Sequence, residues 1–195
     1  MSKIFCLMGK SSCGKDTIFK ELINENDLAL KPIVLYTTRP KRINEVDGVE
    51  YHFINEEKLK YFQDLGKVIE VRRYNTVHGE WCYATIDDGQ FNFSLKNYIT
   101  IITLEAYQSL RKYFGQEVVY PIYIDMEDGI RLERALKREQ SQANPNYKEM
   151  CRRFLADDED FSKQYLNECN IQKSYLNYKL SECTNEIITD IKKNI

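Results

Sequence analysis

Two glycines five residues apart, with a lysine directly after the second, form the clearest chemical pattern in the sequence. They lie in Gly9-Lys10-Ser11-Ser12-Cys13-Gly14-Lys15, between the apolar run 3–8 and a segment with helical spacing of apolar residues. Glycines let a backbone wrap closely around an anion, and loop amides and a helix N-terminus supply positive potential toward it. The stretch therefore predicts a phosphate-binding loop of the form G-x-x-x-x-G-K-[S/T], with Lys15 on the outer phosphates. A chance glycine-rich turn is the alternative.

One position departs from that motif, because Asp16 and not Ser or Thr follows the lysine, with Thr17 next. Magnesium prefers oxygen ligands, so we expect Asp16 to bind the Mg²⁺ that accompanies ATP, directly or through water. The alternative is a carboxylate that merely favours the first helical turn. The ATP-binding residues expected from the motif are Gly9, Ser11, Ser12, Cys13, Gly14, Lys15, Asp16 and Thr17.

Further along, arginines are spaced so that they could bind an anion together. Arg39 and Arg42 flank a proline-stiffened turn and could clamp a phosphate. Three more arginines lie at i, i+3 and i+7 of one predicted helix, and another pair follows beyond the polar gap 140–146. Solvated charged faces are the alternative for each group. These further arginines are Arg131, Arg134, Arg138, Arg152 and Arg153.

The order and spacing of these stretches resemble the guanylate kinase family of P-loop nucleotide kinases. The resemblance rests on the loop at 9–15, on T-T-R-x-x-R at 37–42 and on E-x-x-G-x-x-Y-x-F at 45–53, and it continues less tightly along most of the chain. It implies that Arg39, Arg42, Tyr51 and Tyr83 bind the acceptor phosphate. It also implies that Glu70 reads the guanine edge with Thr85 near the base, that Asn177 lies near the donor base, and that Arg138 and Arg153 reach the transferred phosphoryl group.

Two departures from the family pattern bear on these roles. Residues 74–85, with His78 and Trp81, replace a shorter turn, so the register of Tyr83 and Thr85 is open. Ile101 and Thr103 stand where most of the family carries two aspartates that line the metal and the acceptor. Both the way Mg²⁺ is held and part of the guanine readout are therefore in question.

The function implied by the resemblance is Mg²⁺-dependent transfer of the terminal phosphoryl group of ATP to GMP or dGMP. A related kinase acting on another nucleoside or deoxynucleoside monophosphate is the first alternative. The second is a non-catalytic guanylate-kinase-like binding module, although such modules typically lose the phosphate loop. Lys15, Arg138 and Arg153 are the residues expected to be catalytic.

The composition narrows the choice of partners and compartment. The chain has 195 residues, a net charge of −2 and 43% hydrophobic residues, which argues against binding nucleic acid through bulk charge. Its apolar runs are shorter than the roughly 18 residues that a membrane span needs. Six cysteines are scattered without C-x-x-C spacing, as expected for reduced thiols in the cytoplasm. The expected partners are nucleotides, and the protein could be a monomer or a homodimer.

The elements that must position these residues follow a βα rhythm. Strands are expected at 3–8, 33–36, 98–102, 118–124 and 175–180. Helices are expected after Lys15, from Asp87, over 104–114, within 128–157 on either side of the polar gap 140–146, and over 186–193, where Thr184 is the N-cap. This indicates an α/β fold with a parallel sheet flanked by helices. By resemblance, 1–33, 95–128 and 160–195 form the P-loop core, 34–90 an inserted β-rich monophosphate-binding subdomain, and 129–159 a helical lid.

Overall fold

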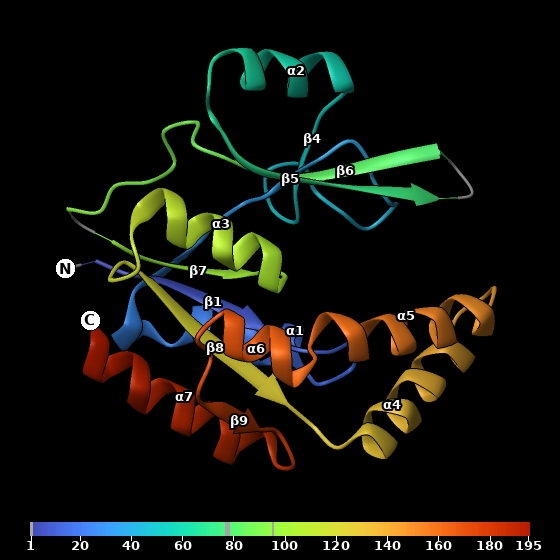
Figure 1. Cartoon of the computed structure of the whole chain (residues 1–195). Coiled ribbons are helices and arrows are strands. Elements are labelled where there is room, and N and C mark those ends of the chain that lie inside the picture. The colour runs from blue at the N-terminus through green and yellow to red at the C-terminus, as the bar shows by residue number, and fades with distance from the viewer. Residues whose placement is uncertain (1, 77–78, 95) are drawn as a thin grey trace.

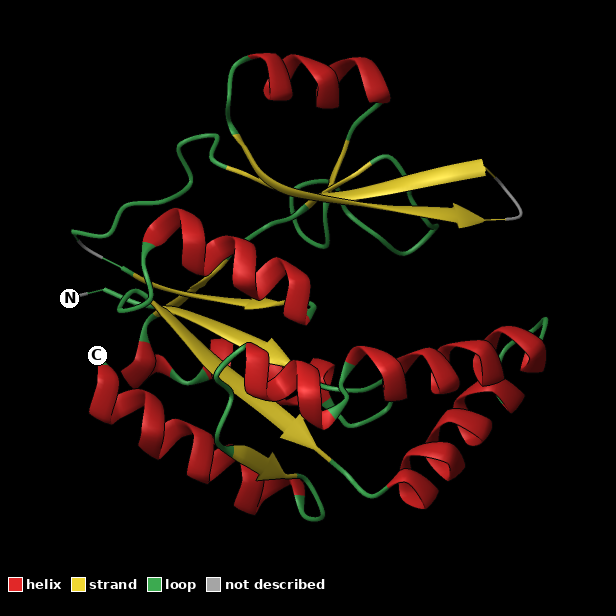
Figure 2. Ribbon diagram, in the orientation of Figure 1, coloured by secondary structure: helices red, strands yellow, loops and turns green. Residues whose placement is uncertain are grey.

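A five-stranded parallel sheet forms the centre of the computed structural model, which describes residues 2–76, 79–94 and 96–195 (Figures 1 and 2). The strand order is β2-β7-β1-β8-β9, and every pairing is parallel. The expected α/β architecture with a helix-flanked parallel sheet is confirmed. The strands are β1 (Ile4–Met8), β2 (Leu30–Pro32), β7 (Asn97–Ile101), β8 (Val119–Asp125) and β9 (Ser174–Leu176).

Strand β1 shows why both faces of this sheet are covered. All five of its residues are buried, and they alternate between two apolar clusters. Ile4, Cys6 and Met8 pack with α3 (Leu104–Phe114), while Phe5 and Leu7 pack with α1 (Lys15–Asn24) and α7 (Leu180–Asn194). A continuous apolar run is typical of a strand that lies between two helical layers. The short helices η1 (Asn26–Leu28) and α6 (Lys163–Glu168) complete this part.

A second, four-stranded sheet is inserted between β2 and β7, with the order β4-β3-β6-β5. One of its faces is covered by α2 (Glu56–Asp64), a helix that we did not predict, whose Leu59 and Phe62 pack with Tyr36 and the inward residues of β6. Its other face points toward the core and carries the candidate acceptor residues. The strands are β3 (Tyr36–Thr37), β4 (His52–Phe53), β5 (Val68–Thr76) and β6 (Gly79–Ile86).

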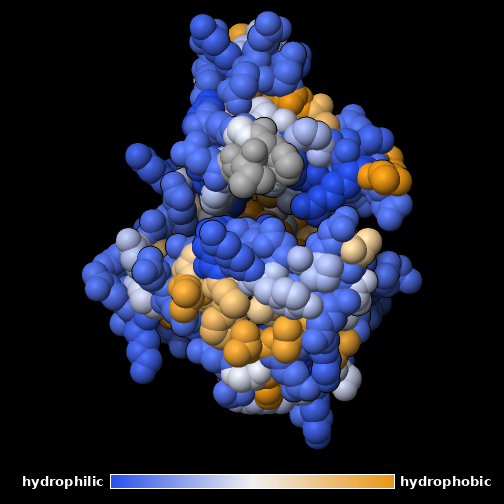
Figure 3. All heavy atoms as spheres, turned by 90° about the vertical axis from the view of Figure 1, so that its right-hand side faces the viewer, coloured by the Kyte–Doolittle hydropathy of each residue, from blue (hydrophilic) through white to orange (hydrophobic). Residues whose placement is uncertain are grey.

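Two antiparallel helices project from the end of β8, as the sequence predicted. They are α4 (Asp128–Gln140) and α5 (Tyr147–Asp160). Figure 1 shows that the far end of this helix pair, the C-terminal end of β5 and the N-terminal end of β6 extend to the same side of the molecule. Figure 3 views that side and shows an indentation between an upper part that is mostly hydrophilic and a lower part in which hydrophilic and hydrophobic residues are mixed. We call α4, α5 and the residues between them the lid.

Three local predictions were wrong, each for a physical reason, and the first two concern residues 33–36 and 87–90. The expected strand 33–36 is split, because the chain leaves the core sheet after Pro32 and joins the second sheet only at Tyr36. Residues 87–90 form no helix, because Asp87 and Asp88 accept hydrogen bonds from the backbone N–H two residues on and Gly89 has a φ of 97°. Such local bonds compete with a helical turn.

The closing helix begins four residues earlier than its predicted cap, at Leu180. Cys183, Ile187 and Ile191 follow at intervals of four and are buried, which extends the helix toward its N-terminus. Thr184 therefore lies inside α7, where its hydroxyl donates to Glu21 Oε2 over 2.6 Å. Val77 and His78, within the stretch 74–85, lie outside the described residues. No helix in the described part of the chain is long and apolar enough to span a membrane.

Candidate active site

The loop at residues 9–14 connects β1 to α1, and its backbone geometry requires both glycines. Gly9 has a φ of 148°, and a Cβ there would lie 2.2 Å from the carbonyl oxygen of Ile124. Gly14 has a φ of 97°, and a Cβ there would lie 2.3 Å from Nδ2 of Asn177. Both positions exclude any larger residue without rearrangement. Both glycines of the motif are therefore required by the local backbone.

Lys15 folds back over its own loop. Its Nζ donates to the carbonyl oxygens of Gly9, over 2.6 Å, and Lys10, over 2.8 Å. These contacts hold the ammonium group where an anion bound in the loop would meet it. Asn177 fixes the other side of the loop, since its Nδ2 donates to the carbonyl of Cys13 over 2.8 Å. This hydrogen bond joins the loop to a residue 164 positions further along the chain.

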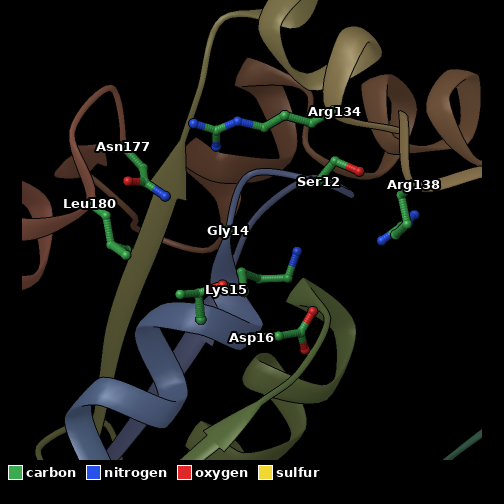
Figure 4. A pocket seen from close by; sticks show the side chains of 9 residues that line it. Ser12, Gly14, Lys15, Asp16, Arg134, Arg138, Asn177 and Leu180 are labelled. Carbon is green, nitrogen blue, oxygen red and sulfur yellow. The ribbon is translucent and has the colours of Figure 1, made fainter. Parts of the chain in front are cut away.

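A cleft opens over this loop and is shown in Figure 4. Two buried side-chain oxygens at this cleft, Ser12 Oγ and Asn177 Oδ1, have no hydrogen-bond partner among the described residues. Buried polar atoms are rarely left so, which makes these two atoms suited to a polar ligand. The lining consists of Ser12, Gly14, Lys15, Asp16, Thr17, Arg134, Arg138, Asn177 and Leu180.

Asp16 stands exposed at the start of α1, on the edge of this cleft. Within the described residues, its carboxylate has no ion-pair or hydrogen-bond partner. The hydroxyl of Thr17 lies on the same cleft. A carboxylate, a hydroxyl and water are the ligands that Mg²⁺ takes beside phosphates, so the residues present fit that ion.

Arg131 does not share the position of its two helix neighbours, although all three were predicted to lie on one face. Its side chain is fully buried and donates to Asp128 Oδ1, over 2.6 Å, and to the carbonyl of Ser11, over 3.1 Å. Asp157 of α5 lies 3.4 Å away and accepts the backbone N–H of Ser11 over 2.7 Å. Sequence reasoning missed this anchor between the lid and the phosphate loop, because its partners are more than 100 residues apart.

A second cleft brings together arginines from the lid and from the inserted segment. Arg42, Arg138 and Arg153 all line it, together with Ser11 of the loop. Glu149 holds Arg153 over 2.7 Å and Arg152 over 2.8 Å. Arg138 lines both clefts, and neither it nor Arg134 has a side-chain partner among the described residues. This places an unpaired guanidinium between the phosphate loop and Arg42.

Arg39 is buried and held by two hydrogen bonds to Glu45, over 2.9 and 2.7 Å. These bonds hold the pKa of Glu45 at about 2 and raise the pKa of Arg39. The guanidinium lies 5.5 Å from the ring of Tyr51, which in turn packs edge-on against Tyr83 at 5.6 Å. The structure thus gathers Arg39, Tyr51 and Tyr83, while Arg42 stands exposed at the second cleft.

The expected base readers meet on the β5–β6 hairpin. Glu70 is 8% exposed, and the hydroxyl of Thr85, its cross-strand partner, donates to Glu70 Oε1 over 2.7 Å. Arg72 also binds this carboxylate and was not singled out from the sequence. The signal available was its spacing, since residues two apart on a strand share a face. Tyr83 pairs with Arg72 across the hairpin, so the register puts Tyr83 and Thr85 on the face of Glu70.

Comparisons with known proteins agree with one another. A family model described as guanylate kinase matches residues 1–179. A guanylate kinase of Helicobacter hepaticus is 30% identical over 151 residues, covering 71% of this chain and 69% of the relative, and that of Chlamydia felis is 28% identical over 178 residues, covering 89% and 83%. The match to the Clostridioides difficile relative is 42% identical over 77 residues, which is 39% of this chain and only 37% of that protein.

A solved structure supports the same arrangement of elements. The crystal structure of guanylate kinase from Anaplasma phagocytophilum aligns with a TM-score of 0.66 and 16% identity, covering 98% of this chain and 85% of that one. At that identity the likeness concerns the fold.

Proposed function

The chain belongs to the guanylate kinase family, and from this premise we propose that it transfers the terminal phosphoryl group of ATP to GMP or dGMP. The observation that carries the proposal is the position of Arg138, which lines both the cleft over the phosphate loop and the cleft that contains Arg42 and Arg153. A guanidinium between a donor-phosphate site and an acceptor-phosphate site is suited to the charge that develops during phosphoryl transfer. The clefts are two halves of one reaction site.

On the donor side, we assign Gly9, Ser12, Gly14 and Lys15 to the phosphates of ATP. The loop amides and the start of α1 supply positive potential, and Lys15 exchanges its loop carbonyls for phosphate oxygens. Asn177 lies beside the loop toward the adenosine end. The remaining loop residues assigned to ATP are Ser11, Cys13, Asp16 and Thr17.

Asp16 and Thr17 would hold Mg²⁺ at this site. When bound there, the ion neutralises charge on the outer phosphates and orients them. Their free oxygen atoms at the edge of the cleft support this assignment.

On the acceptor side, Arg39, Arg42, Tyr51 and Tyr83 are assigned to the phosphate of GMP. An oxygen of that phosphate attacks the γ-phosphorus of ATP, a new P–O bond forms, and the bond to the bridging oxygen breaks with its electron pair on ADP. No general base is needed because the nucleophile is already an anion. Positioning and charge neutralisation by Lys15, Arg138 and Arg153 therefore make up the catalysis. Glu70 and Thr85 bind the base.

The six free cysteines, five of them buried, support a reducing compartment, and we place the protein in the cytoplasm. A coupled assay of ADP release with GMP, dGMP, AMP and UMP tests the whole proposal. We expect GMP or dGMP to give the highest kcat/KM. The highest value with AMP or UMP would identify a related kinase for another monophosphate, and turnover with none of the four would favour a binding module.

A further inference from the structure

Arg72 binds Glu70, the carboxylate that is expected to be free to bind guanine. Its side chain is 10% exposed and projects from β5 on the same face as Glu70. The guanidinium binds that carboxylate side-on, with Nε 2.9 Å from Oε2 and Nη2 3.3 Å from Oε1. The carboxylate is therefore ion-paired before any nucleotide binds.

The remaining hydrogen-bonding capacity of Glu70 is small. A carboxylate offers about four acceptor positions, two on each oxygen. Arg72 uses one on each oxygen, and the hydroxyl of Thr85 uses the second on Oε1. Among the described residues, nothing occupies the second position on Oε2. Guanine carries two neighbouring donors, N1–H and the 2-amino group, so this arrangement accepts only one of them.

The wall opposite the hairpin does not supply a second acceptor of the same kind. Thr103 Oγ1 lies 3.4 Å from Nη1 of Arg72 and also accepts the backbone N–H of Ala106 at the start of α3. Ile101, at the end of β7, is apolar. Among the described residues, Glu70 and Arg72 thus interact with each other and with the hydroxyls of Thr85 and Thr103, and their charges cancel. The side chain of Tyr74 also interacts with Arg72.

We propose that Arg72 is a specificity-determining residue that donates to the carbonyl oxygen O6 of the acceptor base, while Glu70 accepts from the adjacent N1–H. The proposal rests on the proposed function. The pair then reads the O=C–N–H edge that guanine and hypoxanthine share and is indifferent to the 2-amino group. Adenine presents an amino donor to Arg72 and a bare ring nitrogen to Glu70, so both contacts are mismatched. Unpaired polar groups of this kind cause strong discrimination.

The first test compares kcat/KM for GMP, IMP and AMP in the unaltered protein. We expect GMP and IMP to lie within about tenfold of each other and both to exceed AMP by about 100-fold or more. If GMP exceeds IMP by more than about 100-fold, the 2-amino group is read and the inference is wrong. If none of the three is phosphorylated, the proposed function fails, which is a different result.

The second test replaces the side chain with Arg72→Met, which keeps its length and removes its donors. GMP and IMP should fall together by about 10- to 100-fold while AMP changes by less than about threefold. Arg73→Met is the matched control, because Arg73 lies on the opposite face and pairs with Glu56 and Glu80, so the ratio of GMP to AMP should not change. A structural role for Arg72 would instead lower all three substrates equally.

Arg72→Lys keeps the inference falsifiable if the methionine variant does not fold. The lysine retains one charged donor but cannot bind Glu70 and the base through a planar fork. We expect it to keep the preference for GMP over AMP at about a tenth of the original ratio. An unchanged or increased ratio of GMP to AMP in either folded variant would show that Arg72 only holds Glu70, and would overturn the inference.

Discussion

Two arginines on the donor side of the candidate site and two on the acceptor side are held in opposite ways. On the donor side, Arg134 and Arg138 face the cleft without a partner among the described residues. On the acceptor side, Arg39 is clamped by Glu45, and Arg72 by Glu70. Unpaired cations need an anionic ligand to order them, whereas paired cations are already oriented. We therefore expect Arg134 and Arg138 to contribute mainly once an anionic ligand is bound. Arg39 and Arg72 should be oriented before the acceptor binds.

Breaking the donor half should give the largest effect. Lys15→Ala removes the ammonium group that contacts the backbone carbonyls of the loop. The same group is expected to bind the outer phosphates. We expect kcat to fall by about 10³-fold or more, with far-UV circular dichroism unchanged, because the side chain is not part of the apolar core. A folded Lys15→Ala protein with nearly full activity would contradict the assignment of the phosphate loop.

The anchor that holds the lid against the loop is expected to matter for stability. Arg131→Met removes a fully buried cation and leaves Asp157 without its ion-pair partner. We expect a loss of about 3 kcal/mol in the free energy of unfolding, or roughly 6–12 °C in Tm. Lys137→Met, which removes an exposed pair with Glu133 on the same helix, should change the free energy of unfolding far less. Equal melting of the two variants would show that Arg131 is no anchor.

The preorganisation of the acceptor half is tested by loosening Arg39. Glu45→Gln replaces two charge-assisted hydrogen bonds with weaker ones, so we expect KM for GMP to rise about tenfold with kcat nearly unchanged. Glu57→Gln, an exposed carboxylate on α2, is the control and should leave KM unchanged. A fall in kcat at constant KM would mean that Arg39 acts in the transition state instead.

The same pair sets a pH dependence. The pKa of Glu45 is lowered to about 2 from its ordinary value of 4.5, so the stabilisation it provides is complete above about pH 4.5 and is lost as the pH falls toward 2. KM for GMP should therefore not vary through this pair between pH 5 and 8. A KM that rises on going from pH 7 to pH 5 in the unaltered protein, and not in Glu45→Gln, would contradict this assignment.

The difference between local patterns and contacts made by the tertiary fold explains what the sequence could predict. The loop at 9–14 is contiguous, and its two glycines meet a local backbone requirement, so the helix that follows it was predictable. Parallel strands β7 and β8 were predictable because both are apolar runs buried on two sides. Arg131 looked like its neighbour Arg134, since only the tertiary fold decides which one meets Asp157. The pairing of Arg72 with Glu70 was hidden for a related reason, because strand spacing gives a shared face but no orientation of the side chains.

Asp16 offers the finest test of the donor half, because it changes one ligand type without removing the loop. If its free carboxylate serves Mg²⁺, Asp16→Ser should raise the magnesium concentration for half-maximal activity by about 3- to 10-fold at saturating ATP and GMP. Glu57→Ser is the control, since Glu57 is also a carboxylate in a first helical turn, and should leave the magnesium dependence unchanged. A magnesium titration of initial rates measures both.

An acidic residue in place of Thr103, the N-cap of α3, would not compensate for this loss. Thr103→Asp would place a carboxylate within reach of Arg72, whose Nη1 already lies 3.4 Å from Thr103 Oγ1, and the new charge would pair with that arginine. We therefore expect Asp16→Ser with Thr103→Asp to need as much magnesium as Asp16→Ser alone. A double variant with the original magnesium dependence would show that a carboxylate at position 103 can hold the metal. An unchanged dependence in Asp16→Ser itself would reduce Asp16 to a residue that favours the start of α1.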